Sequence, residues 1–168
     1  MKKTAFALLL SAASFGSAYA ASGVVNVPTI SSTVATKLVA EAVQVCAAKG
    51  FPVSSSVVNA AGQRIAFLRG DGAPMDTDPV SFRKAYTVFS WGTANHKTTT
   101  SQLQDAKITG PADGSITTIA KMLALPGGVL LQDSNGVSIG GIGVSGVPDG
   151  HIDEACAQAA IAKYKDQL

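Results

Sequence analysis

The chain has 168 residues, of which 46% are hydrophobic and 14% are charged, with 13 Lys+Arg against 11 Asp+Glu. Residues 1–20 are typical of a secretion signal: two lysines precede the apolar run 5–10, and Ala18-Tyr19-Ala20 is the small-x-small pattern that a signal peptidase cuts. Cleavage after Ala20 removes the two lysines and leaves 148 residues with a net charge of zero. The zero net charge argues against nucleic acid or an acidic membrane as a partner, since both require clustered positive charge. The apolar run 5–10 is too short to span a bilayer. We expect a periplasmic or secreted protein.

We interpret residues 21–31 as an extended leader and residues 32–168 as a single domain. Ser31 and Ser32 are typical helix N-caps and Gly50 is typical of a helix C-terminus, which predicts a helix from residue 32 to about residue 50. Its apolar residues recur at helical spacing and include Cys46, so we place Cys46 on the buried face.

Two β-hairpins are predicted from β-rich runs around short turns. The first joins residues 53–59 to 64–69, and the second joins 129–132 to 137–145 through Asp133-Ser134-Asn135-Gly136. Both hairpins imply antiparallel pairing, which favours an α+β fold over alternating βαβ units.

Helices are predicted around these hairpins. One begins at Asp78-Pro79 and ends near Gly92, and a short one is capped within residues 98–101. A further segment, 116–125, follows a Gly/Pro/Asp loop at 109–114 and has the length of another helix. The final helix is expected over about 150–165, with Glu154 and Gln158 on its solvent side and Cys156 on its buried side.

The glycine-rich segment 141–146 matches G-x-G-x-x-G, the dinucleotide-binding pattern. That pattern needs a second parallel strand after the following helix, and the unit does not close within residues 1–168. We therefore expect these glycines to allow close approach of backbone or ligand. Hydrolase triads and preformed zinc sites have no supporting spacing, since only His96 and His151 are available as imidazoles.

Cys46 and Cys156 are both expected on buried helix faces. Export would place them in an oxidising compartment, where disulfides can form. Two interpretations stay open from the residues alone. They are either a pair of buried thiols or, if the first and last helices lie side by side, a disulfide bond worth about 4–5 kcal/mol in the chain-entropy model.

Seven short segments form a combined pattern: 52–54 (PVS), 57–62 (VVNAAG), 67–74 (FLRGDGAP), 84–87 (KAYT), 125–129 (LPGGV), 141–146 (GIGVSG) and 153–157 (DEACA). In this order, over about residues 32–167, they resemble the GlcG/HbpS family of haem-binding proteins. The resemblance implies an α/β/α sandwich with an antiparallel sheet of about five strands and with the first and last helices on one face. It therefore favours the Cys46–Cys156 disulfide. It also implies homo-oligomers, in agreement with the low charge.

The resemblance implies an exported protein that binds haem for storage, sensing or delivery. A corrinoid is the second candidate for the ligand. Two alternatives remain. One is an enzyme that degrades haem or a small metabolite in the same pocket, with Lys84, Tyr86 or Asp71 transferring protons. The other is a non-catalytic accessory subunit of a redox or sensor system, bound to a partner protein.

Haem requires an apolar slot, an axial donor and cations for its propionates. His96 and His151 are the candidate metal and haem-iron ligands. We expect them to be joined by residues at the family's motif positions, which should converge on one pocket: Arg69, Asp71, Lys84, Tyr86, Thr87, Gly127 and Gly128.

Overall fold

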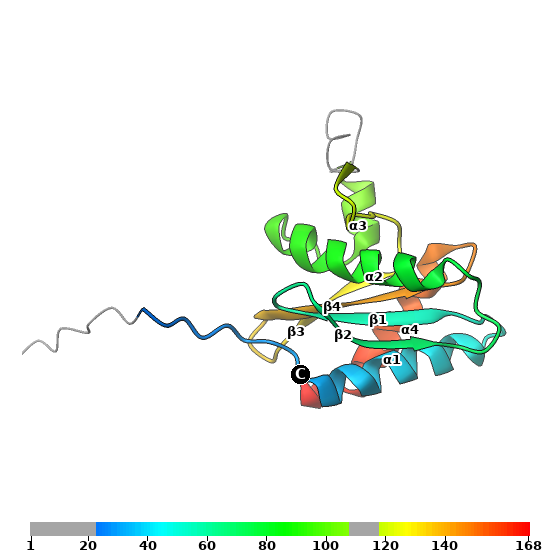
Figure 1. The fold of residues 1–168 in the computed structure, drawn as a ribbon, viewed down its shortest axis with the longest axis horizontal. Helices are drawn as coiled ribbons and strands as arrows, with labels where there is room; N and C mark the ends of the chain where they lie inside the picture. Colours follow the sequence, from blue (N-terminus) through cyan, green and yellow to red (C-terminus); the bar gives the residue numbers. More distant parts are fainter. Residues whose placement is uncertain (1–22, 108–117) are drawn as a thin grey trace, which may run out of the picture.

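The computed structural model describes residues 23–107 and 118–168, so the expected secretion signal (1–20) and the loop at 109–114 lie outside the described residues. Within them, a four-stranded antiparallel sheet lies between two helical layers, with α2 and α3 on one face and α1 and α4 on the other (Figure 1). The elements in chain order are α1 (Ser32–Ala47), β1 (Ser54–Asn59), β2 (Arg64–Arg69), α2 (Thr77–Thr87), the π-helical segment η1 (Val88–Gly92), α3 (Thr100–Asp105), β3 (Gly128–Gln132), β4 (Ser138–Ser145), α4 (Gly150–Lys163) and the 3-10 segment η4 (Lys165–Gln167). The expected sandwich is confirmed, with four described strands where we expected about five.

Both predicted hairpins form, and the first strand of the first hairpin, β1, pairs with the second strand of the second hairpin, β4, to give the order β2-β1-β4-β3. In the second hairpin, the Asp133 carboxylate accepts hydrogen bonds from the backbone N–H groups of Asn135 and Val137, each at 2.8 Å. These bonds are typical of an Asx turn and hold Gly136 in its left-handed conformation, with φ 78°. The central pair, β1 and β4, is buried between the helical layers.

The α2 layer lies unusually close to β4 because β4 presents glycines to it. A Cβ on Gly141 would meet the Ala85 carbonyl oxygen at 2.5 Å, and a Cβ on Gly143 would overlap the Ser81 carbonyl oxygen. The G-x-G-x-x-G match is therefore a helix–sheet packing feature, as the sequence argument expected. Hydroxyl pairs tie the same layers together, since Ser56 Oγ and Ser81 Oγ lie 2.9 Å apart.

The α1 and α4 helices pack side by side on the other face and are joined by the disulfide that the resemblance favoured. Cys46 and Cys156 have Cα atoms 5.7 Å apart and are separated by 110 positions in sequence. Ser31 caps α1 as predicted, because its Oγ accepts a hydrogen bond from Val34 N at 3.3 Å.

Two expectations about helices are wrong. Residues 118–125 form turns and short irregular segments, so the described part of 116–125 contains no α-helix. Glu154 is buried, whereas we placed it on the solvent side of the last helix. No helix of the described residues is long and apolar enough to cross a membrane.

Candidate functional site

A buried ion pair lies where α2 meets the end of β4 and the start of α4. Lys84 Nζ lies 2.9 Å from Asp153 Oδ2 and donates a second hydrogen bond to the Val144 carbonyl oxygen at 3.0 Å. The two charged side chains are only 4% and 1% exposed. Lys84 was predicted to touch a ligand, but its ammonium is occupied by these partners. It therefore holds α2 to α4 through the interior of the domain.

Burial dominates the electrostatics of this pair. Desolvation raises the pKa of the Asp153 carboxyl above its ordinary value of 3.8, although the Lys84 ammonium and the Val147 backbone N–H act in the opposite direction. Val147 N donates to Asp153 Oδ1 at 3.2 Å, so both carboxylate oxygens have partners. The carboxylate thus fixes the loop before α4 as well as the lysine.

Glu154 extends this polar cluster toward α3. Its carboxylate accepts hydrogen bonds from Ser101 Oγ at 2.7 Å, from Ser101 N at 3.3 Å and from Gly127 N at 3.3 Å. Gly128 N donates to Thr100 Oγ1 at 2.9 Å, which binds the same loop to α3. The predicted residues Gly127 and Gly128 therefore belong to the structural cluster around Lys84, Asp153 and Glu154, which we call the buried polar cluster.

Sequence reasoning missed the role of Asp153, although a signal was present. Asp153, Cys156, Ala157 and Ala160 follow one helical stripe and are all buried. A carboxylate on the stripe that carries a buried cysteine requires a cation or several N–H donors inside the protein.

Tyr86 lies in an open hollow of about 510 Å³ between the first hairpin and α2. Its ring lies near one cationic group and one aromatic ring of the same hollow. Lys121 Nζ is 5.4 Å from the centre of the Tyr86 ring, and the Phe82 ring centre is 6.1 Å from it. The Arg64 guanidinium lies 5.6 Å from the Phe82 ring and pairs with Asp78. This space, lined also by residues 61–63 and Pro79, is the Tyr86 hollow.

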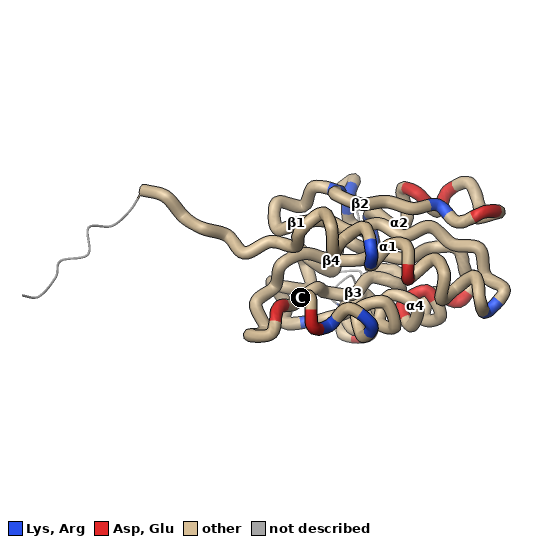
Figure 2. The backbone as a smooth tube through the Cα atoms, turned by 90° about the horizontal axis from the view of Figure 1, so that it is seen from below, with Lys and Arg blue, Asp and Glu red and all other residues tan. Residues whose placement is uncertain are grey.

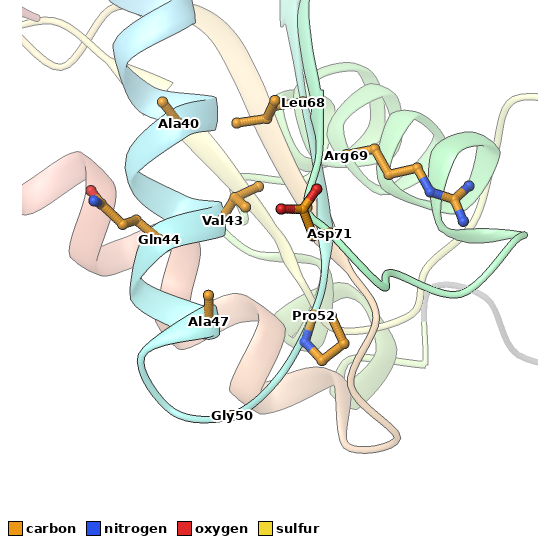
Figure 3. A pocket seen from close by; sticks show the side chains of 10 residues that line it. Ala40, Val43, Gln44, Ala47, Gly50, Pro52, Leu68, Arg69 and Asp71 are labelled. Atoms are coloured by element: carbon orange, nitrogen blue, oxygen red, sulfur yellow. The ribbon is translucent and has the colours of Figure 1, made fainter.

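Arg69 and Asp71 line a second hollow, of about 710 Å³, between α1 and β2 (Figure 3). Its walls are mostly apolar and come from Ala40, Val43, Ala47, Pro52 and Leu68, with Gln44 at one side. Figure 3 shows Arg69 pointing away from α1, where its guanidinium donates to the Ala73 carbonyl oxygen at 2.5 Å. We call this space the α1–β2 hollow. None of its lining residues is a histidine, cysteine, methionine or tyrosine.

The two histidines are both exposed and do not share a hollow. His96 has a positive φ of 55° and lines a third hollow of about 380 Å³ with Lys97 and Gln132. His151 is in the first turn of α4, after the N-cap Asp149. Among the described residues, no group of three or more His, Cys, Asp or Glu side chains is placed to hold a metal ion.

The predicted site residues therefore divide into separate places. Lys84, Gly127 and Gly128 meet in the buried polar cluster, and Thr87 is 1% exposed, with its Oγ1 accepting a hydrogen bond from Leu123 N at 2.7 Å. The remaining five lie on three hollows or on the surface: Tyr86, Arg69, Asp71, His96 and His151. The expected convergence on one pocket is not found within this single chain.

The fold, a four-stranded antiparallel sheet between two helical layers, defines the chain as an α/β/α sandwich of the kind that the resemblance implied. The family model described as "Haem degrading protein HbpS-like" matches residues 30–162, so this chain belongs to the HbpS-like family. Among curated proteins no match is found.

Solved structures agree with this assignment. The chain is similar to the crystal structure of HbpS, with 32% identity, a TM-score of 0.74, and coverage of 84% of this chain and 94% of that chain. A double mutant of Streptomyces reticuli HbpS gives 31% identity, a TM-score of 0.70, and coverage of 86% and 93%. The crystal structure of a PduOC:heme complex gives 27% identity, a TM-score of 0.67, and coverage of 80% and 94%.

Proposed function

We propose that this chain is an exported protein that binds haem, in a storage, sensing or delivery role. Membership in the HbpS-like family and similarity to a protein crystallised with haem support the ligand. The Cys46–Cys156 disulfide and the signal-like residues 1–20 support export, because disulfides persist in oxidising compartments.

The observation that carries the haem proposal is the set of groups in the Tyr86 hollow. A tyrosine phenolate is an established axial ligand of haem iron, and propionates are held by arginine and lysine. The hollow combines Tyr86 with the cations Arg64 and Lys121 and with the Phe82 ring, and its volume is within the range of about 300–1,000 Å³ of ligand sites. The α1–β2 hollow is larger but has no iron donor. The residues of the Tyr86 hollow therefore fit the group best.

In this arrangement Tyr86 would bind the iron, Arg64 and Lys121 would neutralise the propionates, and Phe82 would cover one part of the macrocycle. Bound haem supplies one-electron redox chemistry at iron. The buried polar cluster keeps α2 fixed against the sheet, and α2 carries both Tyr86 and Phe82. The Lys84–Asp153 ion pair would thus hold Tyr86 and Phe82 in position without contacting the bound haem.

The family description also favours a second function, the degradation of haem in the same hollow. Of the three residues expected to transfer protons, Lys84 is buried in its ion pair, so Tyr86 and Asp71 are the groups that line a hollow. Asp71 lines the α1–β2 hollow, which leaves Tyr86 as the acid or base of this alternative.

Titration of the mature protein, residues 21–168, with hemin tests the proposal. We expect a shifted Soret band that saturates at one hemin per binding site, at micromolar hemin. Absence of any spectral change would contradict haem binding. Addition of a reductant separates the two functions, because repeated bleaching of added hemin indicates degradation, whereas a stable ferrous spectrum indicates binding alone.

Export is tested by the intact mass of the protein recovered from the periplasm or medium. We expect a chain that begins at Ala21 and has lost two further mass units through the disulfide. A full-length chain that is retained in the cytoplasm with both thiols free would contradict export.

A further inference from the structure

The two edges of the sheet are covered unequally. On the outer side of β3, Leu130 N donates to the Thr98 carbonyl oxygen at 2.8 Å, and Thr99 forms an isolated antiparallel bridge with Val129. On the outer side of β2, no described residue makes a backbone hydrogen bond. The six residues of β2 thus present an open edge, which soluble proteins usually cover or block because it pairs with other strands.

This open edge runs beside the α1–β2 hollow. Leu68 is 39% exposed and lines the hollow together with Val43 of α1, and Figure 3 shows both side chains in the space between helix and strand. Phe67 is 36% exposed on the other side of β2, where the Arg64 guanidinium lies 4.8 Å from its ring. A strand added along β2 would place alternate side chains over the hollow, next to Leu68.

The leader, residues 21–31, has the properties of such a strand. Its described part is extended and leaves the body near the turn of the first hairpin, where Ala60 N donates to Thr29 Oγ1 at 3.1 Å (Figures 1 and 2). Val25 and Val27 are 81% and 64% exposed and, two positions apart, share one face in an extended chain. Figure 2 shows that charged residues are scattered over the body and absent from this segment.

We propose that the leader of a second copy of this chain adds as a further strand to the outer edge of β2, with Val25 and Val27 filling the α1–β2 hollow. Residues 23–27 span about 17 Å when extended, which is enough to cover five of the six residues of β2. Pro28 has no N–H, so the added pairing ends before it.

The sequence of β2 favours the leader over a second β2 as the occupant. Antiparallel pairing of two β2 strands about their common centre would bring Arg64 opposite Arg69 of the partner copy, and like charges directly opposite each other destabilise a sheet. The leader brings only Gly, Val and Asn to this edge. The valines of the leader would also cover the mostly apolar walls of the hollow, which are open in a single chain.

The test compares Val27→Asp with Asn26→Asp in the mature protein. Each variant adds one carboxylate to the leader, but only position 27 faces the hollow, and neither touches the core. Analytical ultracentrifugation should show that Val27→Asp weakens self-association by about tenfold or more, because a charge would be buried in apolar surroundings. Asn26→Asp should change it by less than about twofold. Hydrogen exchange over residues 64–69 should be slow in the wild type and fast in Val27→Asp.

Three results would overturn the proposal. The first is a wild-type protein that is monomeric at the concentrations of the exchange experiment. The second is an equal effect of the two variants on association. The third is faster exchange over residues 64–69 in Val27→Asp with unchanged association, which would mean that the leader covers β2 of its own chain.

Discussion

Replacement of Asp153 by alanine is expected to destabilise the domain more than any surface substitution. The change removes one partner of an ion pair whose side chains are 4% and 1% exposed, so the Lys84 ammonium stays buried with only the Val144 carbonyl as a partner. Removal of one member of a buried pair typically costs about 3–5 kcal/mol, a large share of the about 5–15 kcal/mol that stabilises an ordinary domain.

Urea unfolding followed by far-ultraviolet circular dichroism, with the disulfide intact, measures this cost. Asp166→Ala is the matched control, because Asp166 is exposed, and it should change the free energy of unfolding by less than about 0.5 kcal/mol. The double variant Lys84→Met/Asp153→Leu should recover most of the loss, since apolar side chains of similar size replace both charges. The reasoning is refuted if Asp153→Ala lies within about 1 kcal/mol of the wild type.

The same carboxylate gives a pH dependence with a definite sign. Burial raises the pKa of Asp153 above 3.8, so the native state binds this proton more tightly than the unfolded state does. The contribution of this group to stability therefore decreases as the pH rises from about 3.8 to the native pKa, and is constant above it. We expect the free energy of unfolding of the wild type, relative to Asp153→Asn, to fall over this interval. An increase would contradict the desolvation argument.

The remaining stability predictions concern the disulfide and the glycine contacts. Replacement of both Cys46 and Cys156 by alanine should cost about 4–5 kcal/mol, because the bond closes a loop across 110 positions; a loss below about 1 kcal/mol in urea unfolding would contradict this. Gly143→Ala should cost about 3 kcal/mol or more, because its Cβ would overlap the Ser81 carbonyl oxygen of α2, whereas Gly23→Ala, with no neighbour within 4 Å, should be neutral by the same measurement.

The hairpins and the first helix were predictable because their signals are local. Asn135-Gly136 specifies a tight turn, and Ser31 supplies an oxygen for the first helical N–H groups, whatever the rest of the fold does. The last helix was placed correctly, with Cys156 buried and Gln158 exposed as expected, but Glu154 was placed on the wrong side. Glu154 is buried because Ser101 and Gly127 donate to it, and these partners are distant in sequence.

The candidate site was less predictable than the fold. The motif segments that carry the family resemblance include Lys84 and Gly127, and both were expected at a ligand. Gly127 has φ 124°, and a Cβ there would lie 2.7 Å from Lys84 Nζ, so Gly127 leaves space for the ammonium that pairs with Asp153. A motif position shows that a residue type is required, but only its three-dimensional neighbours show whether the requirement is structural. Tyr86, from the same motif, is the one whose ring lines a hollow.

Hemin affinity of Tyr86→Phe, compared with Tyr164→Phe, tests the central claim most directly. Both variants remove one phenol oxygen, but Tyr164 lies at the end of α4, outside the Tyr86 hollow. We predict that Tyr86→Phe weakens hemin binding by about tenfold or more and changes the ferric Soret band, whereas Tyr164→Phe changes neither. Unchanged affinity and spectrum in Tyr86→Phe, with loss of both in His96→Ala or His151→Ala, would contradict the assignment of the Tyr86 hollow as the haem site.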